Sequence, residues 1–456
     1  MIDSFGKVVF FSGIGGISMS ALAELFIKNG HVVFGSDDNL TQESIKKLSE
    51  MGAVVYKGQS MLNIINSSPD TYIYSVAIKE DNEEVIQARK SCSQVLSRGQ
   101  AFGLISKSYE KLIAVAGSHG KTTCSALISH ILHSLGYKPT AFIGGSVKNF
   151  NTQLLLGEKE LLVLEACEYY NSFLNFNSYI AVVLNLQDDH MDYFKTSENL
   201  KKSFKIFVGN TIPSGFVILN KDDENLIDFN VENRKCYYFS LFDKGADIYV
   251  EKYAINDEGH LIFDCNLWGE KVSNVYLPLI GEHNLYNAVC SILVCRILGV
   301  STNDIVSALR SFKGIARRYE FSGFINGAKV INDYAHHPTE ITRVILETKK
   351  IVKGRVFCLF QSHTYSRTKE LWDDFCDALS IADVVVGYPI YPAREQPIYG
   401  VTMENMIYEI RRKNRSAVYF DNYDDILKYL KNNVQQEDCV LVLGAGDIVN
   451  FLKFIW

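Results

Sequence analysis

The 456-residue sequence has no excess of basic charge and no apolar segment long enough to cross a membrane. Lys and Arg number 46 and Asp and Glu 52, so the formal net charge is −6. This balance lacks the charge signature of a general nucleic-acid binder. No apolar run approaches the roughly 20 residues of a membrane span. The N-terminal segment has no basic n-region, so we interpret it as the first strand of a cytoplasmic protein.

The ten cysteines are scattered, without a Cys-x-x-Cys pair or a His/Cys cluster at zinc spacing. We therefore expect buried thiols in a reducing compartment and no disulfide framework. The chain is 47% hydrophobic and 21% charged, which is typical of a globular protein. At about 150 residues per domain, its length predicts about three domains.

Short β-branched apolar runs alternate with longer helical patterns along the chain. This alternation predicts an α/β fold with parallel sheets and crossover helices. The pattern restarts twice, which divides the chain into three predicted domains, 1–107, 108–314 and 315–456. An irregular stretch within the second domain predicts a small antiparallel piece around 248–254 and 261–264.

The predicted helices that follow the clearest strands cover 17–29, 121–135 and 284–298. The predicted strands cover 7–12, 31–36, 53–56, 71–75, 112–116, 161–166, 180–186, 215–219, 328–331, 355–360, 383–387, 417–420 and 439–443.

The most specific local pattern is the segment AVAGSHGKTT at 114–123, which follows an apolar run and opens a helix. Backbone N–H groups of such a loop can surround phosphates at a helix N-terminus. Lys121 would reach the β- and γ-phosphates, and Thr122 would place its hydroxyl on Mg²⁺. The spacing Gly-x-x-Gly-Lys-Thr is shorter than in the common P-loop. The alternative is a Gly-Lys-Thr turn without a ligand.

A second glycine loop, GIGGIS at 13–18, also lies between a strand and a helix. Asp37 ends the next strand about twenty residues later, which is close to a dinucleotide fingerprint. An NAD enzyme and a UDP-sugar binder can both use such a loop, and a purely structural turn is the third interpretation. Two anion loops in successive domains predict two phosphorylated substrates. A dehydrogenase would not need the Lys121 loop, and a simple ATPase would not need the Gly13 loop.

Polar residues follow several predicted strands. Glu165 ends one of them and is a candidate Mg²⁺ ligand, although a polar strand end is the alternative. The string Asp188-Asp189-His190-Met191-Asp192 follows the next predicted strand. It is either a candidate ion site or a solvated acidic loop. The His-containing loops 332–340 and 360–368 indicate a binding edge in the third domain. The string LGAGD at 443–447 predicts a tight turn rather than a third phosphate loop.

Two further groups are open to a functional and a structural interpretation. His283, Asn284 and Asn287 open a helix and could bind a base, or could be cap and surface residues. Arg317 and Arg318 stand at the second boundary, where an arginine can contact a γ-phosphate or be solvated.

Taken in order, these strings resemble the Mur ligase family, the ATP-dependent amide-forming enzymes of peptidoglycan synthesis. The resemblance rests on segments 13–20, 114–123, 189–192, 281–288, 333–340 and on Tyr391-Pro392-Ala393-Arg394-Glu395. It implies a Rossmann-like UDP-sugar domain, a central P-loop ATPase domain and a Rossmann-like C-terminal domain that binds the amino acid. It also implies ATP and Mg²⁺ as cofactors, UDP-N-acetylmuramic acid and L-alanine as substrates, and a monomer or weak homodimer.

The resemblance also implies roles for individual residues, and it makes Lys121, Glu165, His190 and Arg318 the catalytic group. The ATP phosphates would be bound by Gly117, Ser118, His119, Gly120, Lys121, Thr122, Thr123 and Arg318. Adenine and ribose would be bound by His283, Asn284, Asn287 and Asp333. The metal ligands would be Thr122, Glu165 and His190. The UDP-sugar would be bound by Gly13, Gly15, Gly16, Ile17, Ser18, Ser36 and Asp37. The incoming amino acid would be surrounded by Tyr334, His336, His363 and Arg367.

The sequence departs from the family pattern at three places, of which Asn332, in place of a frequent aspartate, matters least. Cys167, Tyr169 and Tyr170 interrupt a segment that is often more acidic in this family. Thr364 stands where many members have an arginine, which leaves Arg367 as the expected carboxylate clamp.

The expected chemistry is transfer of the γ-phosphoryl group to a carboxylate, followed by attack of an amine on the acyl phosphate. A base near His336 or His363 would keep that amine neutral, and domain closure would exclude water. Three alternatives remain at this point. They are a recycling ligase that accepts a preformed tripeptide, a Rossmann oxidoreductase, and a non-catalytic UDP-sugar/ATP sensor.

Overall fold

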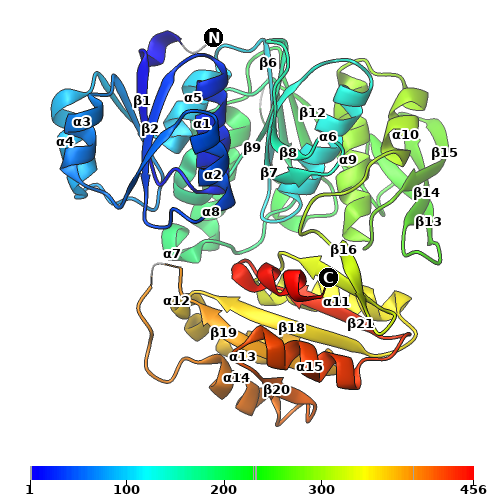
Figure 1. The fold of residues 1–456 in the computed structure, drawn as a ribbon. Helices are drawn as coiled ribbons and strands as arrows, with labels where there is room; N and C mark the ends of the chain where they lie inside the picture. The colour runs from blue at the N-terminus through cyan, green and yellow to red at the C-terminus, as the bar shows by residue number, and fades with distance from the viewer. Residues whose placement is uncertain (1–2, 230, 232–233, 394, 456) are drawn as a thin grey trace. The chain divides into compact units, whose positions relative to one another are not determined.

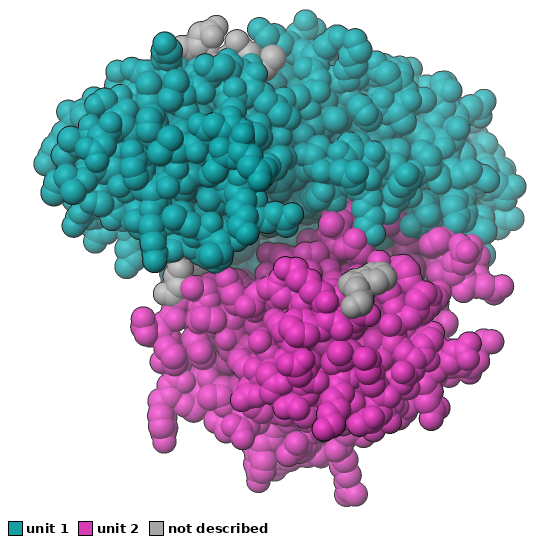
Figure 2. All heavy atoms as spheres, in the orientation of Figure 1, with its two compact units in different colours: residues 1–254, 261–278, 282–313 teal, residues 255–260, 279–281, 314–456 magenta. Residues whose placement is uncertain are grey.

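The computed structural model describes residues 3–229, 231, 234–393 and 395–455. The chain divides into two compact units (Figure 2). The first contains residues 1–254, 261–278 and 282–313, and the second contains residues 255–260, 279–281 and 314–456. Three separate sheets, largely parallel, confirm the predicted α/β fold. The domain boundaries at 107 and 314 stay predictions.

The N-terminal sheet is parallel, with the order β3-β2-β1-β4-β5. Its strands are β1 (Val8–Ser12), β2 (Val32–Asp37), β3 (Val54–Lys57), β4 (Thr71–Tyr74) and β5 (Gln94–Ser97). The order reverses between β1 and β4, and ligands of such sheets bind outside the carboxyl ends of the strands at this point. The Gly13 loop follows β1 there.

Helices cover both faces of this sheet (Figure 1). Phe10 of β1 packs with the helices α3 (Met61–Ser67) and α4 (Glu83–Ser91). Its neighbours Val9 and Phe11 pack on the other face with α1 (Ile17–Lys28), α2 (Glu43–Glu50) and α5 (Arg98–Ser106). A strand that is buried on both faces has a continuous apolar sequence, which is why VVFF was recognisable.

The central sheet has the order β15-β14-β13-β12-β11-β10-β6-β9-β7-β8. Its inner strands are β6 (Lys111–Ala116), β9 (Leu161–Glu165), β10 (Ile180–Val183), β11 (Phe216–Asn220) and β12 (Lys235–Ser240). One edge ends in β7 (Thr140–Val147) and β8 (Thr152–Leu155). The other ends in β13 (Ile248–Ile255), β14 (Leu261–Leu267) and β15 (Glu270–Leu277). The predicted strands 248–254 and 261–264 are present as β13 and β14, which are neighbours in the sheet. β14 pairs antiparallel with β15, which was not predicted, and the three strands extend the central sheet instead of forming a separate piece.

The helices of the central region are α6 (Lys121–Ser134), α7 (Met191–Phe194), α8 (Ser197–Gly209), α9 (His283–Ile297) and α10 (Thr302–Arg310). The 3-10 segment η2 (Tyr169–Asn175) follows β9. Among the described helices, none is both long and apolar enough to span a membrane. All ten cysteines are free thiols, and seven are buried.

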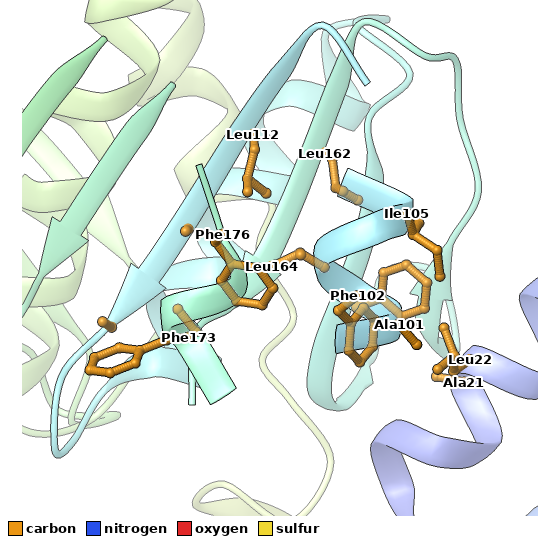
Figure 3. Packing of buried hydrophobic residues seen from close by; sticks show 14 of the residues in the cluster. Ala21, Leu22, Ala101, Phe102, Ile105, Leu112, Leu162, Leu164, Phe173 and Phe176 are labelled. Atoms are coloured by element: carbon orange, nitrogen blue, oxygen red, sulfur yellow. The ribbon is translucent and has the colours of Figure 1, made fainter. Parts of the chain in front are cut away.

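The N-terminal and central sheets share one hydrophobic cluster, which explains why they belong to the same compact unit. Ala21 and Leu22 of α1 lie near Ile105 of α5, and α5 packs against β9 (Figure 3). The Phe102 ring of α5 meets the Phe142 ring edge-on, with ring centroids 4.9 Å apart.

The second unit contains a sheet with the order β16-β17-β21-β18-β19-β20. Its strands are β16 (Glu320–Ile325), β17 (Ala328–Asp333), β18 (Val356–His363), β19 (Val384–Tyr391), β20 (Ala417–Tyr419) and β21 (Cys439–Leu443). All pairings are parallel except the β16–β17 hairpin. The last strand of the chain therefore lies in the middle of the sheet.

Both faces of this second sheet are covered. Its helices are α11 (Pro338–Ile351), α12 (Tyr365–Glu370), α13 (Trp372–Ser380), α14 (Met403–Ile410), α15 (Tyr423–Asn433) and the 3-10 segment η4 (Asp447–Phe454). Cys358 and Phe360 of β18 belong to one hydrophobic cluster, and Phe357 and Leu359 belong to another. This alternation is that of a strand whose successive side chains point to opposite faces.

Candidate active site

The Lys121 loop joins β6 to the N-terminus of α6. Gly117 has φ +142° and Gly120 has φ +85°, conformations that glycine adopts without strain. A Cβ on Gly120 would lie 2.5 Å from Oδ1 of Asn287, so α9 approaches the loop closely at this position. Asn185 holds the loop from β10, because its Oδ1 accepts from the His119 N–H at 2.8 Å and its Nδ2 donates to the His119 carbonyl at 3.0 Å.

Lys121 pairs with a carboxylate that the sequence did not single out. Its Nζ lies 3.0 Å from both carboxylate oxygens of Glu168 and donates to the Gly117 carbonyl at 2.5 Å. The Glu168 side chain is only 1% exposed. Burial by itself would lower the pKa of Lys121, but the adjacent Glu168 carboxylate raises this pKa above its ordinary value. The ammonium therefore stays charged, as a phosphate ligand requires.

Glu168 also lies in a cluster with Asp189 and His190. One ligand atom from each of these three residues falls within 4.8 Å of the others. Tyr169 stacks on the His190 imidazole, with ring centroids 4.4 Å apart. Burial would raise the pKa of Asp189, but His190 and Lys121 hold it below its usual range. This carboxylate is thus ionised at neutral pH.

The second acidic position is Glu165, at the carboxyl end of β9. The Thr122 hydroxyl donates to Glu165 Oε2 at 3.2 Å, and Glu165 Oε1 accepts from the Gly144 N–H. Carboxylate and hydroxyl oxygens are the ligands that Mg²⁺ prefers in proteins. The donor set of Thr122, Glu165 and the Glu168 cluster therefore fits this ion.

Two asparagines at the start of α9 lie beside the Lys121 loop. Asn287 donates from Nδ2 to Oδ1 of Asn284 at 2.9 Å, and both residues are buried. Together with the close approach of Asn287 to Gly120, this arrangement places the predicted adenine-binding residues next to the predicted phosphate loop. His283 is the first residue of the same helix.

The Gly13 loop is held by the strand that pairs with β1. The carbonyl of Ser36 accepts from the N–H groups of Gly13 at 2.8 Å and Ile14 at 3.1 Å. Asp37 Oδ2 accepts from the Gly15 N–H at 2.9 Å. Gly16 caps α1, whose first residues are Ile17 and Ser18. The Ser36 carbonyl and the buried Asp37 carboxylate thus hold the loop in place.

In the second unit, polar residues lie close together at the carboxyl ends of β17 and β18. The guanidinium groups of Arg317 and Arg318 lie 4.9 and 5.5 Å from the centroid of the Tyr334 ring. Asp333 is buried and accepts from the N–H groups of Tyr319 and Ala335, both at 2.7 Å. Burial raises the pKa of Asp333, although Arg318 and these two N–H groups oppose the shift.

Two imidazoles face each other in this region. The rings of His336 and His363 have centroids 6.3 Å apart, and His363 stacks on Tyr391 at 5.6 Å. Burial lowers the pKa of His336. Burial, together with His336 and Arg367, lowers the pKa of His363 to about 4. Both rings are therefore neutral at pH 7.

The loop at 443–447 is a tight turn. Arg317 Nη2 donates to the carbonyl groups of Gly444 at 2.5 Å and Gly446 at 3.2 Å. The N–H of Ile448 donates to Oε1 of Gln361 at 2.9 Å. Side chains of the same unit therefore hold this turn.

The structure thus brings the predicted residues together in three groups: the Gly13 loop, the Lys121 loop with its acids and α9, and the Arg318 to Arg367 group. Sequence reasoning did not single out Glu168 or Asn185, and it named Asp189 and Arg317 as candidates without giving them an individual role. The signal for Glu168 was its place three residues beyond the end of a strand next to the phosphate-loop strand. Arg394 and the side chain of Asp192 lie outside the described residues.

Comparison with known proteins assigns the three regions to one family. The models described as "Mur ligase family, catalytic domain", "Mur ligase middle domain" and "Mur ligase, glutamate ligase domain" match residues 9–110, 115–295 and 317–446.

Curated relatives match over almost the whole length. The UDP-N-acetylmuramate–L-alanine ligase of Caldicellulosiruptor bescii is 39% identical over 450 residues, or 98% of this chain and 97% of the relative. That of Clostridium acetobutylicum is 38% identical over 447 residues, or 98% of this chain and 96% of the relative. The crystal structure of the UDP-N-acetylmuramate–alanine ligase from Thermotoga maritima has a TM-score of 0.82 and 25% identity, covering 98% of this chain and 97% of that one. By its sequence, its sheets and its phosphate loop, the chain belongs to the Mur ligase family.

Proposed function

We propose that this protein is an ATP-dependent ligase that joins L-alanine to the carboxylate of UDP-N-acetylmuramic acid, with ADP and phosphate as the other products. The observation that carries the proposal is the 39% identity to a UDP-N-acetylmuramate–L-alanine ligase over 98% of the chain. The Lys121 loop and the Gly13 loop support it, because the reaction needs a nucleoside triphosphate and a UDP-sugar.

The reaction requires activation, because a carboxylate does not react with an amine. Transfer of the γ-phosphoryl group to the sugar's carboxylate gives an acyl phosphate, and the phosphate then becomes the leaving group. The amine of L-alanine attacks the acyl carbon, and the tetrahedral intermediate collapses to the amide and inorganic phosphate. In the first step a P–O bond of ATP breaks and a P–O bond to the carboxylate forms. In the second step the C–N bond of the amide forms, the C–O bond to phosphate breaks, and the nitrogen gives up a proton.

Lys121 is proposed to bind the transferred phosphoryl group. It would leave the Glu168 carboxylate, 3.0 Å away, and turn its charge towards the phosphate oxygens. The N–H groups of Gly117 to Thr123 would bind the remaining phosphates at the N-terminus of α6. Asn284 and Asn287 would contact adenine, Asp333 the ribose, and Arg318 the γ-phosphate.

Mg²⁺ would be held by Thr122, Glu165 and His190, with Glu168 and Asp189 added to this set by their positions. When bound, it would neutralise charge on the phosphate oxygens. Release of Lys121 from Glu168 would leave that carboxylate ionised and available.

The second unit is proposed to bind L-alanine through Tyr334, His336, His363 and Arg367. Arg367 would pair with the amino acid's carboxylate. An imidazole that is neutral at pH 7 can accept a proton, so His336 or His363 could take the one that the ammonium group must lose.

Phosphate release tests the proposal directly. The enzyme is incubated with Mg-ATP and UDP-N-acetylmuramic acid, and L-alanine, glycine, L-serine or a preformed tripeptide is added in turn. We expect release that requires both the sugar nucleotide and L-alanine, and that stops when EDTA removes Mg²⁺. Preference for the tripeptide would move the protein to the recycling activity. Absence of release with every amine, despite binding of the UDP-sugar, would contradict a ligase function.

We further propose that the protein works in the cytoplasm as a monomer or weak homodimer. The proposed location rests on the nucleotide substrates, and the proposed oligomeric state rests on the resemblance to the family. Sedimentation at micromolar concentration and fractionation of cells that express the tagged protein would test the two parts separately.

A further inference from the structure

A carboxylate in the N-terminal sheet region is completely buried and has no place in the reaction described above. Glu84, in the first turn of α4, has no exposed surface. Burying an ionised carboxylate is costly unless hydrogen bonds replace its hydration. The groups that surround Glu84 therefore indicate what the carboxylate does.

Five neutral donors converge on Glu84. Its Oε2 accepts from the hydroxyls of Ser12 at 2.6 Å, Ser36 at 2.8 Å and Tyr72 at 3.4 Å. Its Oε1 accepts from Nδ2 of Asn63 at 2.7 Å and from the Ser60 N–H at 3.3 Å. Burial and the Glu84 carboxylate raise the pKa of Tyr72, so the phenol keeps the proton that it donates.

Two of these donors stand directly next to the predicted UDP-sugar loop. Ser12 is the last residue of β1 and precedes Gly13. Ser36 precedes Asp37 on β2, and its carbonyl accepts from the Gly13 and Ile14 N–H groups. The hydroxyls of Ser12 and Ser36 also lie 3.3 Å apart. Glu84 thus ties together the ends of the two strands that hold the loop.

We propose that Glu84 is a positioning residue for the UDP-sugar: through Ser12 and Ser36 it sets the conformation of the Gly13 loop without touching the ligand. The proposal rests on the proposed function of that loop. In the amide variant the remaining oxygen still accepts from Asn63 and the Ser60 N–H, but the new N–H₂ group faces the hydroxyls of Ser12 and Ser36, which must turn from donors into acceptors. We expect this reversal to displace the ends of β1 and β2 and with them the Gly13 loop, while the Lys121 loop keeps its own partners.

Glu84→Gln is the first variant, and Glu24→Gln is its matched control. Glu24 is also a buried carboxylate of the N-terminal region, but it pairs with Lys28 and Lys47, each at 2.8 Å. In Glu84→Gln we expect the KM for UDP-N-acetylmuramic acid and the Kd for UDP to rise about tenfold. The KM for ATP and kcat should stay within about twofold. Glu24→Gln should leave all four constants unchanged to the same extent.

Ser12→Ala provides a smaller change for the event that Glu84→Gln does not fold. It removes one hydroxyl that has no exposed surface and therefore cannot contact the ligand itself. We expect the KM for the sugar nucleotide to rise about threefold, in line with one hydrogen bond. The double variant should behave like Glu84→Gln alone, because Ser12 acts through the same carboxylate.

Several results would overturn the proposal. The first is an unchanged Kd for UDP in Glu84→Gln, or in Ser12→Ala if Glu84→Gln is insoluble. The second is a rise in the KM for ATP as large as the rise in the KM for the sugar nucleotide. The third is an equal loss of UDP affinity in the control Glu24→Gln. If the wild-type protein did not turn over UDP-N-acetylmuramic acid, the proposed function would fail. The calorimetric Kd for UDP would still decide the role of Glu84.

Discussion

At the residue scale, Lys121 and Glu168 form a buried ion pair at the phosphate loop. Lys121→Ala should lower phosphate release at least about a thousandfold, because it removes a charge that stabilises the transferred phosphoryl group. It should also lower stability by about 3 kcal/mol, because Glu168 then remains buried without its cation. Steady-state kinetics and thermal unfolding measure the two effects.

The double variant Lys121→Ala/Glu168→Gln separates these effects. It should recover stability but not activity, since the unpaired charge is gone and the phosphate ligand is still missing. Lys138→Ala, which breaks an exposed ion pair with Glu158, should change neither quantity. Normal turnover by the Lys121→Ala variant would contradict the proposal that this loop binds the phosphates of ATP.

A second residue-scale prediction concerns the protonation of His363. Its pKa is lowered to about 4, whereas histidine in an unfolded chain has a pKa of about 6.5. Between these values the unfolded chain binds a proton that the folded chain does not. The contribution of His363 to the free energy of unfolding should therefore be fully present above about pH 6.5 and should be lost as the pH is lowered towards 4.

NMR titration of the histidine ring protons tests this directly, with His363→Gln to assign the resonance. The His363 signal should not move between pH 8 and about pH 5.5. In His363→Gln, the dependence of unfolding free energy on pH in this window should weaken by up to about 1.4 kcal/mol per pH unit. A resonance that titrates near pH 6.5 would contradict a buried neutral ring.

At the element scale, α5 packs against the segment that follows the acidic residues of β9. A Cβ on Gly103 would lie 2.7 Å from the Asn175 carbonyl oxygen of η2. Gly103→Ala should therefore push the two elements apart and lower the free energy of unfolding by about 1–3 kcal/mol. Thermal unfolding measures the loss.

Gly209→Ala is the matched control for this packing. Gly209 ends α8, and a Cβ there would meet nothing within 4 Å. This substitution should be neutral or stabilise by about 0.4–1 kcal/mol. Equal losses in the two variants would contradict the contact with η2 as the cause, because alanine is the better helix former at both positions.

At the scale of the whole molecule, the chain contains two compact units, each with its own hydrophobic clusters. Calorimetry should therefore resolve two unfolding transitions. UDP at a hundred times its Kd should stabilise only the unit that holds the Gly13 loop, by about 2.7 kcal/mol. Gly103 lies in the same unit, so the transition that shifts in the Gly103→Ala variant is the one that belongs to this unit. A shift of both transitions by UDP would contradict independent unfolding.

The sequence predicted most of the inner strands, for a local reason. β1, β6, β18 and β21 are buried on both faces and therefore have continuous apolar sequences. β5, β7, β8, β12, β15 and β16 were not predicted, since edge strands, short strands and strands with many polar residues are less apolar and depend on their neighbours. The strands β13 and β14 were recognisable, but their attachment to the central sheet was not.

Sequence alone determined the two glycine loops between strand and helix, their order and the α/β class, because glycines, strand and helix patterns and the Lys-Thr pair are local in the chain. Only the tertiary structure determined which charges meet. Glu168 is 47 residues from Lys121, and Glu84 is 72 residues from Ser12. Such pairs form only when sheet order brings strand ends together. Burial then decides whether a carboxylate binds an ion, pairs with a lysine or holds a loop.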